Sequence, residues 1–200
     1  MNDVHNSDPL TNAVYGSIKT GIEVCLKEMC AGSAIVLIYS GIDTMAFLSM
    51  PASQVEVTGV DFANWCDRYI QLPGEQVTGL ELFAARCAVV HTFGIESKLS
   101  RQGKCRTIGY SFVGAHPTVY DPAIEPNFVV LSLDALSQAF FAGIDRFLVD
   151  LFADPARRPT VEQRIKKLLM FLPRQYVDEK AVEMGYPAAS SFREASDASD

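Results

Sequence analysis

The segment VTGLELFAARCAVVHTFGIESKLSRQGKCR, residues 77–106, joins the end of a helical pattern to a cluster of positive charge. Apolar side chains at helical spacing predict a helix from Thr78 or Gly79 to Thr92, and Gly94 just beyond favours its end. Four cations follow the glycine: Lys98, Arg101, Lys104 and Arg106. They predict a surface that contacts phosphate groups, and the alternative is an ordinary solvated loop. The rest of the chain is interpreted as the scaffold that presents this segment.

Arg86 and His91 are the chemically active side chains of this predicted helix. Five positions place them about 140° apart on an ideal helix, so they converge only because arginine is long and His91 lies where the helix ends. A guanidinium fits the non-bridging oxygens of a phosphodiester, and an imidazole transfers protons near neutral pH. The pair indicates metal-free cleavage of RNA by attack of its own 2′-oxygen. The alternative is that both side chains only bind the free carbonyls at the helix C-terminus.

A carboxylate lies inside the most apolar stretch of the chain, AIVLIYSGIDTMAFLSM at residues 34–50. This stretch is near the length of a membrane span, but Asp43 and Tyr39 favour a helix at the centre of a helical bundle, ended by Pro51. An unpaired buried charge is costly, so Asp43 needs a partner, and Arg86 is the expected one. Asp43, with Tyr39 one turn away, then either orients Arg86 for function or forms a purely structural pair with it.

Two further amphipathic patterns complete a set of four helices. Apolar residues recur at helical spacing over residues 10–30 and again over residues 62–72, where Asp61 is the expected N-cap. Because the links between the four predicted helices are short, we expect two antiparallel hairpins packed as a bundle over residues 10–95.

The apolar period changes after the basic segment. Residues 107–113 and 127–132 alternate and are rich in β-branched and aromatic side chains, and turn residues fill the space between them. This pattern predicts a β-hairpin, or two short strands around a long loop, within residues 105–132.

A C-terminal helical pair is expected over residues 133–172. Its second helix opens with a capping box, TVEQ at residues 160–163. The chain then loses its periodicity, so residues 174–200 are expected to be a disordered tail, and residues 1–9 a disordered leader. Residues 10–173 are therefore expected to form a single domain.

Composition limits the class of protein. Apolar residues make up 48% of the chain, which is enough for a substantial core, and the net charge of −7 argues against a general nucleic-acid coat protein. The N-terminus has no basic start followed by an apolar run, so we expect a cytoplasmic protein that is not inserted in a membrane. No spacing supplies a set of metal ligands, and no cofactor is expected. Five cysteines without a paired motif are expected to be reduced and buried: Cys25, Cys30, Cys66, Cys87 and Cys105.

Arg86 and His91 form an R-x4-H motif near the end of the last of the two predicted helical hairpins. In this setting residues 10–95 resemble the HEPN family, the "higher eukaryotes and prokaryotes nucleotide-binding" domains. The resemblance implies a four-helix core, homodimers that bring two R-x4-6-H motifs together and, in many members, metal-independent endoribonuclease activity in toxin-antitoxin and defence systems. It assigns phosphate binding to Arg86 and catalysis to His91. Active nucleases of the family commonly have a polar residue after the arginine, and here that residue is Cys87.

The expected fold is thus mainly α: a HEPN-like four-helix bundle with a small β-hairpin insertion and a C-terminal helical pair. The first expected function is a homodimeric RNA-cleaving or RNA-binding protein that uses Arg86 and His91 at a composite site, with Asp43 and Tyr39 in support. The alternative is a non-catalytic HEPN-like module for dimerisation or for binding an antitoxin or nucleotidyltransferase-type protein.

Overall fold

The computed structural model describes residues 11–112, 118–168 and 174–186. The chain divides into two units, Met1–Leu168 and Leu169–Asp200. The predicted leader lies outside the described residues.

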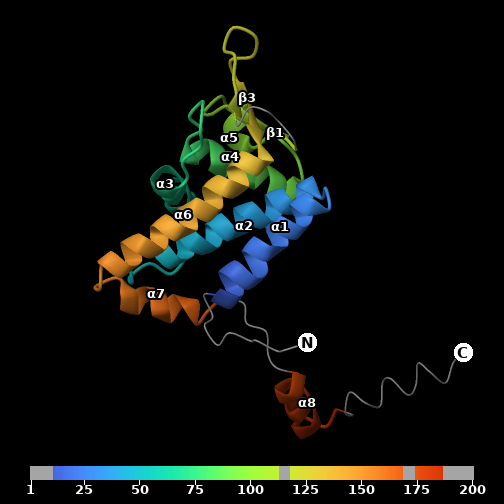
Figure 1. The fold of residues 1–200 in the computed structure, drawn as a ribbon, viewed down its shortest axis with the longest axis vertical. Coiled ribbons are helices and arrows are strands. Elements are labelled where there is room, and N and C mark those ends of the chain that lie inside the picture. Colours follow the sequence, from blue (N-terminus) through green and yellow to red (C-terminus); the bar gives the residue numbers. More distant parts are fainter. Residues whose placement is uncertain (1–10, 113–117, 169–173, 187–200) are drawn as a thin grey trace, which may run out of the picture. The chain divides into compact units, whose positions relative to one another are not determined.

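The first unit is mainly helical, as predicted, and carries a small sheet (Figure 1). Its helices are η1 (Thr11–Lys19), α1 (Thr20–Lys27), α2 (Ala31–Ser49), α3 (Gly59–Tyr69), α4 (Gly79–Thr92), α5 (Lys98–Arg101), α6 (Leu133–Ala153) and α7 (Arg158–Ile165). Its strands are β1 (Thr107–Ser111), β2 (Thr118–Val119) and β3 (Phe128–Ser132).

Helix α2 lies at the centre of the first unit and contacts α1, α3, α4, α6 and α7. It is long and apolar enough to cross a membrane by length and composition alone. Its apolar side chains are nevertheless covered by the other helices, and Ile38, Ile42 and Met45 are completely buried. The even distribution of apolar residues around α2 is therefore explained by its position in the core. As expected, α1 packs on α2 and α3 packs on α4, whereas η1 winds as a π-helix before α1.

Reciprocal capping boxes begin α3 and α4. Thr58 is the N-cap of α3 and accepts a hydrogen bond from the Asp61 amide, while the Asp61 carboxylate accepts one from the Thr58 amide. The prediction that Asp61 itself is the cap was wrong, because the helix begins at Gly59, three residues before the predicted start. Thr78 and Glu81 cap α4 in the same way.

The three strands form one sheet in the order β1-β3-β2. β1 pairs with β3 in parallel, with Thr107 opposite Phe128 and Ser111 opposite Ser132, and β2 pairs with β3 antiparallel. The predicted hairpin was therefore wrong, whereas the alternative of two short strands around a long connection describes β1 and β3. The connection between β1 and β3 is long enough for the crossover that a parallel pair requires, and it places β2 on the other edge of β3.

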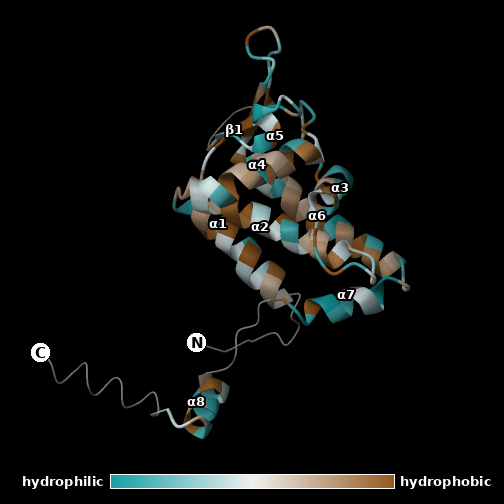
Figure 2. Cartoon of the chain, turned by 180° about the vertical axis from the view of Figure 1, so that it is seen from behind, coloured by the Kyte–Doolittle hydropathy of each residue, from teal (hydrophilic) through white to brown (hydrophobic). Residues whose placement is uncertain are grey.

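Helix α6 begins at Leu133, the predicted start of the helical pair, and Ser132 is its N-cap. Helix α7 begins at Arg158 rather than at the predicted capping box, and Thr160 makes no cap. Its surface is largely hydrophilic (Figure 2). Arg164 is the exception, because it is buried and donates hydrogen bonds to the backbone carbonyls of Phe47, Pro51 and Gln54 at 2.6–3.0 Å. These bonds attach α7 to the end of α2.

In the second unit, α8 (Arg174–Glu183) occupies a region that was predicted to be disordered. Side chains one turn apart support the helix: Gln175 donates to Glu179 at 2.9 Å, and Lys180 pairs with Glu183 at 2.6 Å. The prediction of a tail from residue 174 was wrong for this stretch. The last 14 residues of the predicted tail, 187–200, lie outside the described residues.

The five cysteines are free thiols, but only one of them is fully buried. Burial raises the pKa of the Cys66 thiol well above its usual value. Cys30 is exposed, and the other three are half-buried. The expectation that all five are buried in the core was wrong.

Candidate functional site

The structure brings Asp43, Arg86 and His91 together on one side of the bundle. Asp43 Oδ2 accepts hydrogen bonds from Arg86 Nε at 2.9 Å and pairs with Arg86 Nη2 at 2.8 Å. Arg86 Nη1 lies 3.5 Å from Nε2 of the exposed His91. The Arg86 and Asp43 side chains are 23% and 29% exposed, so solvent still reaches both. The cluster therefore has the access that a ligand requires.

The end of α4 explains how two residues five positions apart converge. Phe93 is the C-cap and has a left-handed backbone with φ of 54°, so the helix stops directly after His91 and Thr92. His91 is thus in the last turn, while Arg86 extends from the turn before. The predicted helix and its end at Thr92 were confirmed.

Asp43 holds the guanidinium of Arg86 in one orientation. Two nitrogens of the arginine bind the same carboxylate oxygen, which leaves Nη1 directed towards His91. Burial raises the pKa of Asp43, and the pairing with Arg86 opposes that rise. When the His91 ring is neutral, the contact with Nη1 requires Nε2 to be the acceptor, so that Nδ1 carries the proton.

Tyr39 is completely buried, and its hydroxyl is hydrogen-bonded to the hydroxyl of Tyr110 on β1. Burial raises the pKa of both phenols, so both stay neutral. The expectation that Tyr39 supports Asp43 was therefore wrong: its polar group connects α2 to the sheet. Tyr39 and Asp43 share a helix, but the buried phenol is satisfied by the strand packed on it.

The four predicted phosphate-binding cations separate into two groups. Lys98, Arg101 and Lys104 are exposed on or just after α5. Arg101 donates one long hydrogen bond, 3.4 Å, to the Glu96 carbonyl. These three side chains form a basic edge that follows the end of α4, and "basic edge" denotes them below.

Arg106 does not belong to the basic edge. It pairs with Glu81 at 2.6 Å and with Glu75 at 2.9 Å, and donates to the Gln76 carbonyl at 2.7 Å. These carboxylates raise its pKa, and the guanidinium also lies over the Tyr120 ring. Its donors and its charge are used within the fold, so the expected phosphate-binding role of Arg106 was wrong.

Glu81 is the buried carboxylate of this network, and the sequence did not single it out. Burial alone would raise its pKa, but hydrogen bonds from Arg106 and Thr78 hold the pKa below its usual value. Its place in a capping box was the available signal, because Thr78 precedes it by three residues. The network attaches the start of α4 to the segment that leads into β1.

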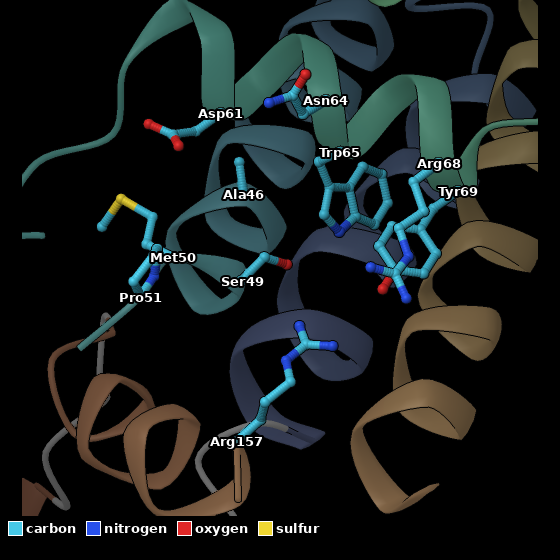
Figure 3. A pocket seen from close by; sticks show the side chains of 10 residues that line it. All are labelled: Ala46, Ser49, Met50, Pro51, Asp61, Asn64, Trp65, Arg68, Tyr69 and Arg157. Atoms are coloured by element: carbon cyan, nitrogen blue, oxygen red, sulfur yellow. The ribbon is translucent and has the colours of Figure 1, made fainter. Parts of the chain in front are cut away.

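A pocket of about 190 Å³ lies between α2, α3 and the connection from α6 to α7 (Figure 3). Its residues come from three distant stretches of the chain, so no local spacing predicts it.

Among the residues that the structure describes, no three His, Cys, Asp or Glu side chains lie close enough to hold a metal ion. Comparisons with models of protein families, with curated protein sequences and with solved structures give no match. The function is therefore inferred from the side chains themselves.

Proposed function

We propose that the protein is a HEPN-like, metal-independent endoribonuclease that acts as a homodimer in the cytoplasm. The observation that supports this most strongly is the cluster of Asp43, Arg86 and His91, in which a fixed guanidinium faces an accessible imidazole nitrogen 3.5 Å away. The basic edge after α4 supplies further positive charge for the phosphates of a bound strand.

Each member of the cluster has a defined task in this reaction. Arg86 binds the non-bridging oxygens of the scissile phosphate, and Asp43 fixes the orientation of the Arg86 guanidinium. When the phosphate binds, its oxygen accepts the Nη1–H of Arg86 in place of His91, which frees the lone pair of Nε2. His91 Nε2 then takes the proton of the neighbouring 2′-hydroxyl, and the 2′-oxygen attacks the phosphorus. The bond from phosphorus to the 5′-oxygen breaks, which leaves a 2′,3′-cyclic phosphate and a 5′-hydroxyl.

The leaving 5′-oxygen needs a proton from a second acid. One cluster contains one imidazole, and its Nε2 is already used as the base. His91 of the partner subunit supplies the second imidazole in the proposed homodimer. The exposed apolar side chains beside His91, which are Val90, Phe93 and Ile95, would form part of the contact between subunits.

A second candidate function follows from the same surface. The Asp43–Arg86 pair already occupies two of the guanidinium nitrogens, and the net charge of −7 disfavours RNA binding. The apolar residues beside His91 then suit a non-catalytic module that dimerises or binds a partner protein of a toxin-antitoxin or defence system.

Cleavage of two matched oligonucleotides separates these functions. Purified protein in EDTA is incubated with an RNA and with the same RNA carrying 2′-deoxyribose at the cleaved linkage. The proposed nuclease cleaves the first and leaves the second intact at that position, because the attacking group is missing. Sedimentation equilibrium measures the dimer in parallel. A stable dimer that cleaves neither substrate supports the non-catalytic module.

A further inference from the structure

The pocket between α2, α3 and the α6–α7 connection contains a buried polar atom without a partner. Trp65 is 2% exposed, and its indole Nε1 makes no hydrogen bond within the described structure. The other end of the indole packs on α6, near Gly143. In Figure 3 the indole nitrogen points towards the space beside Ser49. A buried donor without an acceptor is costly, so a group that accepts from Trp65 is favoured there.

A cation faces the same space. The guanidinium of Arg157 points towards Ser49 and Trp65 (Figure 3) and lies 5.9 Å from the Phe147 ring centre. No carboxylate of the described residues lies within 4.0 Å of it, although it is near enough to the Tyr69 hydroxyl and to Asp150 to favour a lower pKa in both groups. Arg68, the second arginine that lines the pocket, is instead paired with Asp150 at 2.6 Å. The pocket thus places a guanidinium that has no carboxylate in direct contact beside an unsatisfied N–H donor.

Asp61, on α3, also lines the pocket, away from Arg157 (Figure 3). Its negative charge limits the charge that a ligand can carry. Burial alone would raise the pKa of Asp61, but hydrogen bonds from Thr58 and Gln54 hold it below its usual value. Asp61 is therefore ionised at neutral pH and repels a second negative charge. A monoanion suits the pocket better than a dianion.

We propose that this pocket binds a small organic monocarboxylate. The carboxylate accepts hydrogen bonds from Arg157 and Trp65 Nε1, and the apolar body of the ligand contacts Ala46, Met50 and Pro51. A second hollow of about 300 Å³ shares Met50, Pro51 and Arg157 with the pocket, which leaves room for a longer apolar body. None of these residues belongs to the Asp43–Arg86–His91 cluster, so the proposal does not depend on RNA cleavage.

Trp65 is the only tryptophan in the chain, so its fluorescence reports directly on the pocket. The full-length protein is titrated with benzoate, with its neutral analogue benzamide and with phenyl phosphate, up to about 10 mM because weak sites have millimolar Kd. We expect a saturable fluorescence change with benzoate, no saturable change with benzamide, and weaker binding of the dianion phenyl phosphate. Tighter binding of phenyl phosphate would overturn the choice of a monocarboxylate.

Variants test the two contacts. Arg157→Gln should weaken benzoate binding about tenfold or more, because a charged hydrogen bond is lost. Arg158→Gln is the matched control, because Arg158 is exposed and pairs with Glu162 on the surface of α7. The affinity of this variant for benzoate should be unchanged. Trp65→Phe, followed by calorimetry, should weaken binding about threefold to tenfold. Absence of saturable benzoate binding, an equal response to benzamide, or unchanged affinity in Arg157→Gln would overturn the proposal.

Discussion

The substitution Gly79→Ala tests how α4 is seated on α3. Gly79 is the first residue of α4 and is buried. A Cβ atom on this residue would lie closer than 3.0 Å to the Cα, carbonyl carbon and oxygen of Ala63. These are backbone atoms of α3 rather than the end of a flexible side chain, so the overlap is relieved only if the two helices move apart.

The cost follows from three effects of different size. Forcing extra volume into a packed contact costs about 1–3 kcal/mol, and a backbone neighbour places the cost at the upper end. Separating the helices also weakens the 2.5 Å hydrogen bond from the Gly79 amide to Asp67 Oδ1, which costs about 1 kcal/mol. Alanine stabilises a helix by up to about 1 kcal/mol relative to glycine, which offsets this second loss. We therefore expect the free energy of unfolding to fall by about 3 kcal/mol.

Urea denaturation followed by circular dichroism measures this change. Gly94→Ala is the matched control at the other end of the same helix, because a Cβ there would meet only the Thr92 hydroxyl, at 3.0 Å, among the described neighbours. The control should change the free energy of unfolding by no more than about 0.5 kcal/mol. If Gly79→Ala is as stable as Gly94→Ala, the close contact between α3 and α4 described above is refuted.

Three further predictions concern the polar contacts of the first unit. Arg164→Met leaves three backbone carbonyls without their buried donor. The free energy of unfolding should fall by about 3 kcal/mol and Tm by about 6–12 °C. A Tm within about 2 °C of wild type, which corresponds to about 1 kcal/mol or less, would contradict the role of Arg164 in attaching α7 to α2. Glu81→Gln should cost about 2 kcal/mol at neutral pH, because it removes the more buried of the two ion pairs of Arg106 and leaves only the pair with Glu75. Because the pKa of Glu81 is lowered in the folded state, the stability that wild type has over Glu81→Gln should decrease as pH falls below about 4.5. Urea denaturation that shows the same difference in unfolding free energy between the two proteins at pH 7 and at about pH 3.5 would contradict this prediction. Asp43→Asn should lower the RNA cleavage rate about tenfold or more, because Arg86 is no longer held in one orientation. It should change the free energy of unfolding by less than about 1 kcal/mol, because the cost of desolvating Asp43 offsets the gain from the ion pair. Equal cleavage rates for wild type and Asp43→Asn would argue against the orienting role of Asp43.

The helices that carry the cluster were predictable from local patterns. Apolar spacing placed α4 within one residue at each end, and an apolar helix with a single carboxylate correctly indicated a core helix whose Asp43 needs a cation. Both inferences rest on strong local signals: a helical period, and the cost of burying an unpaired charge.

The remaining features depend on contacts between distant parts of the chain. Parallel pairing of β1 with β3 is decided by the path of the connection, which alternation within each strand does not encode. Arg106 looked like part of a basic loop, but Glu81 and Glu75, which lie 25 and 31 positions earlier, take up its donors. Arg157 and Trp65 are likewise far apart in sequence and line the same pocket only in the folded protein.

The RNA cleavage rate of His91→Ala in EDTA tests the proposed chemistry most directly. Wild type is the reference, and His116→Ala is the control because it removes a histidine that lies outside the R-x4-H motif. We predict that His91→Ala loses a factor of about 100 or more, as expected for removal of a general base. We predict that His116→Ala keeps the wild-type rate, and that the wild-type products end in a 2′,3′-cyclic phosphate and a 5′-hydroxyl. Equal rates for His91→Ala and wild type, including no cleavage by either, would contradict the proposal that His91 and Arg86 form a nuclease site.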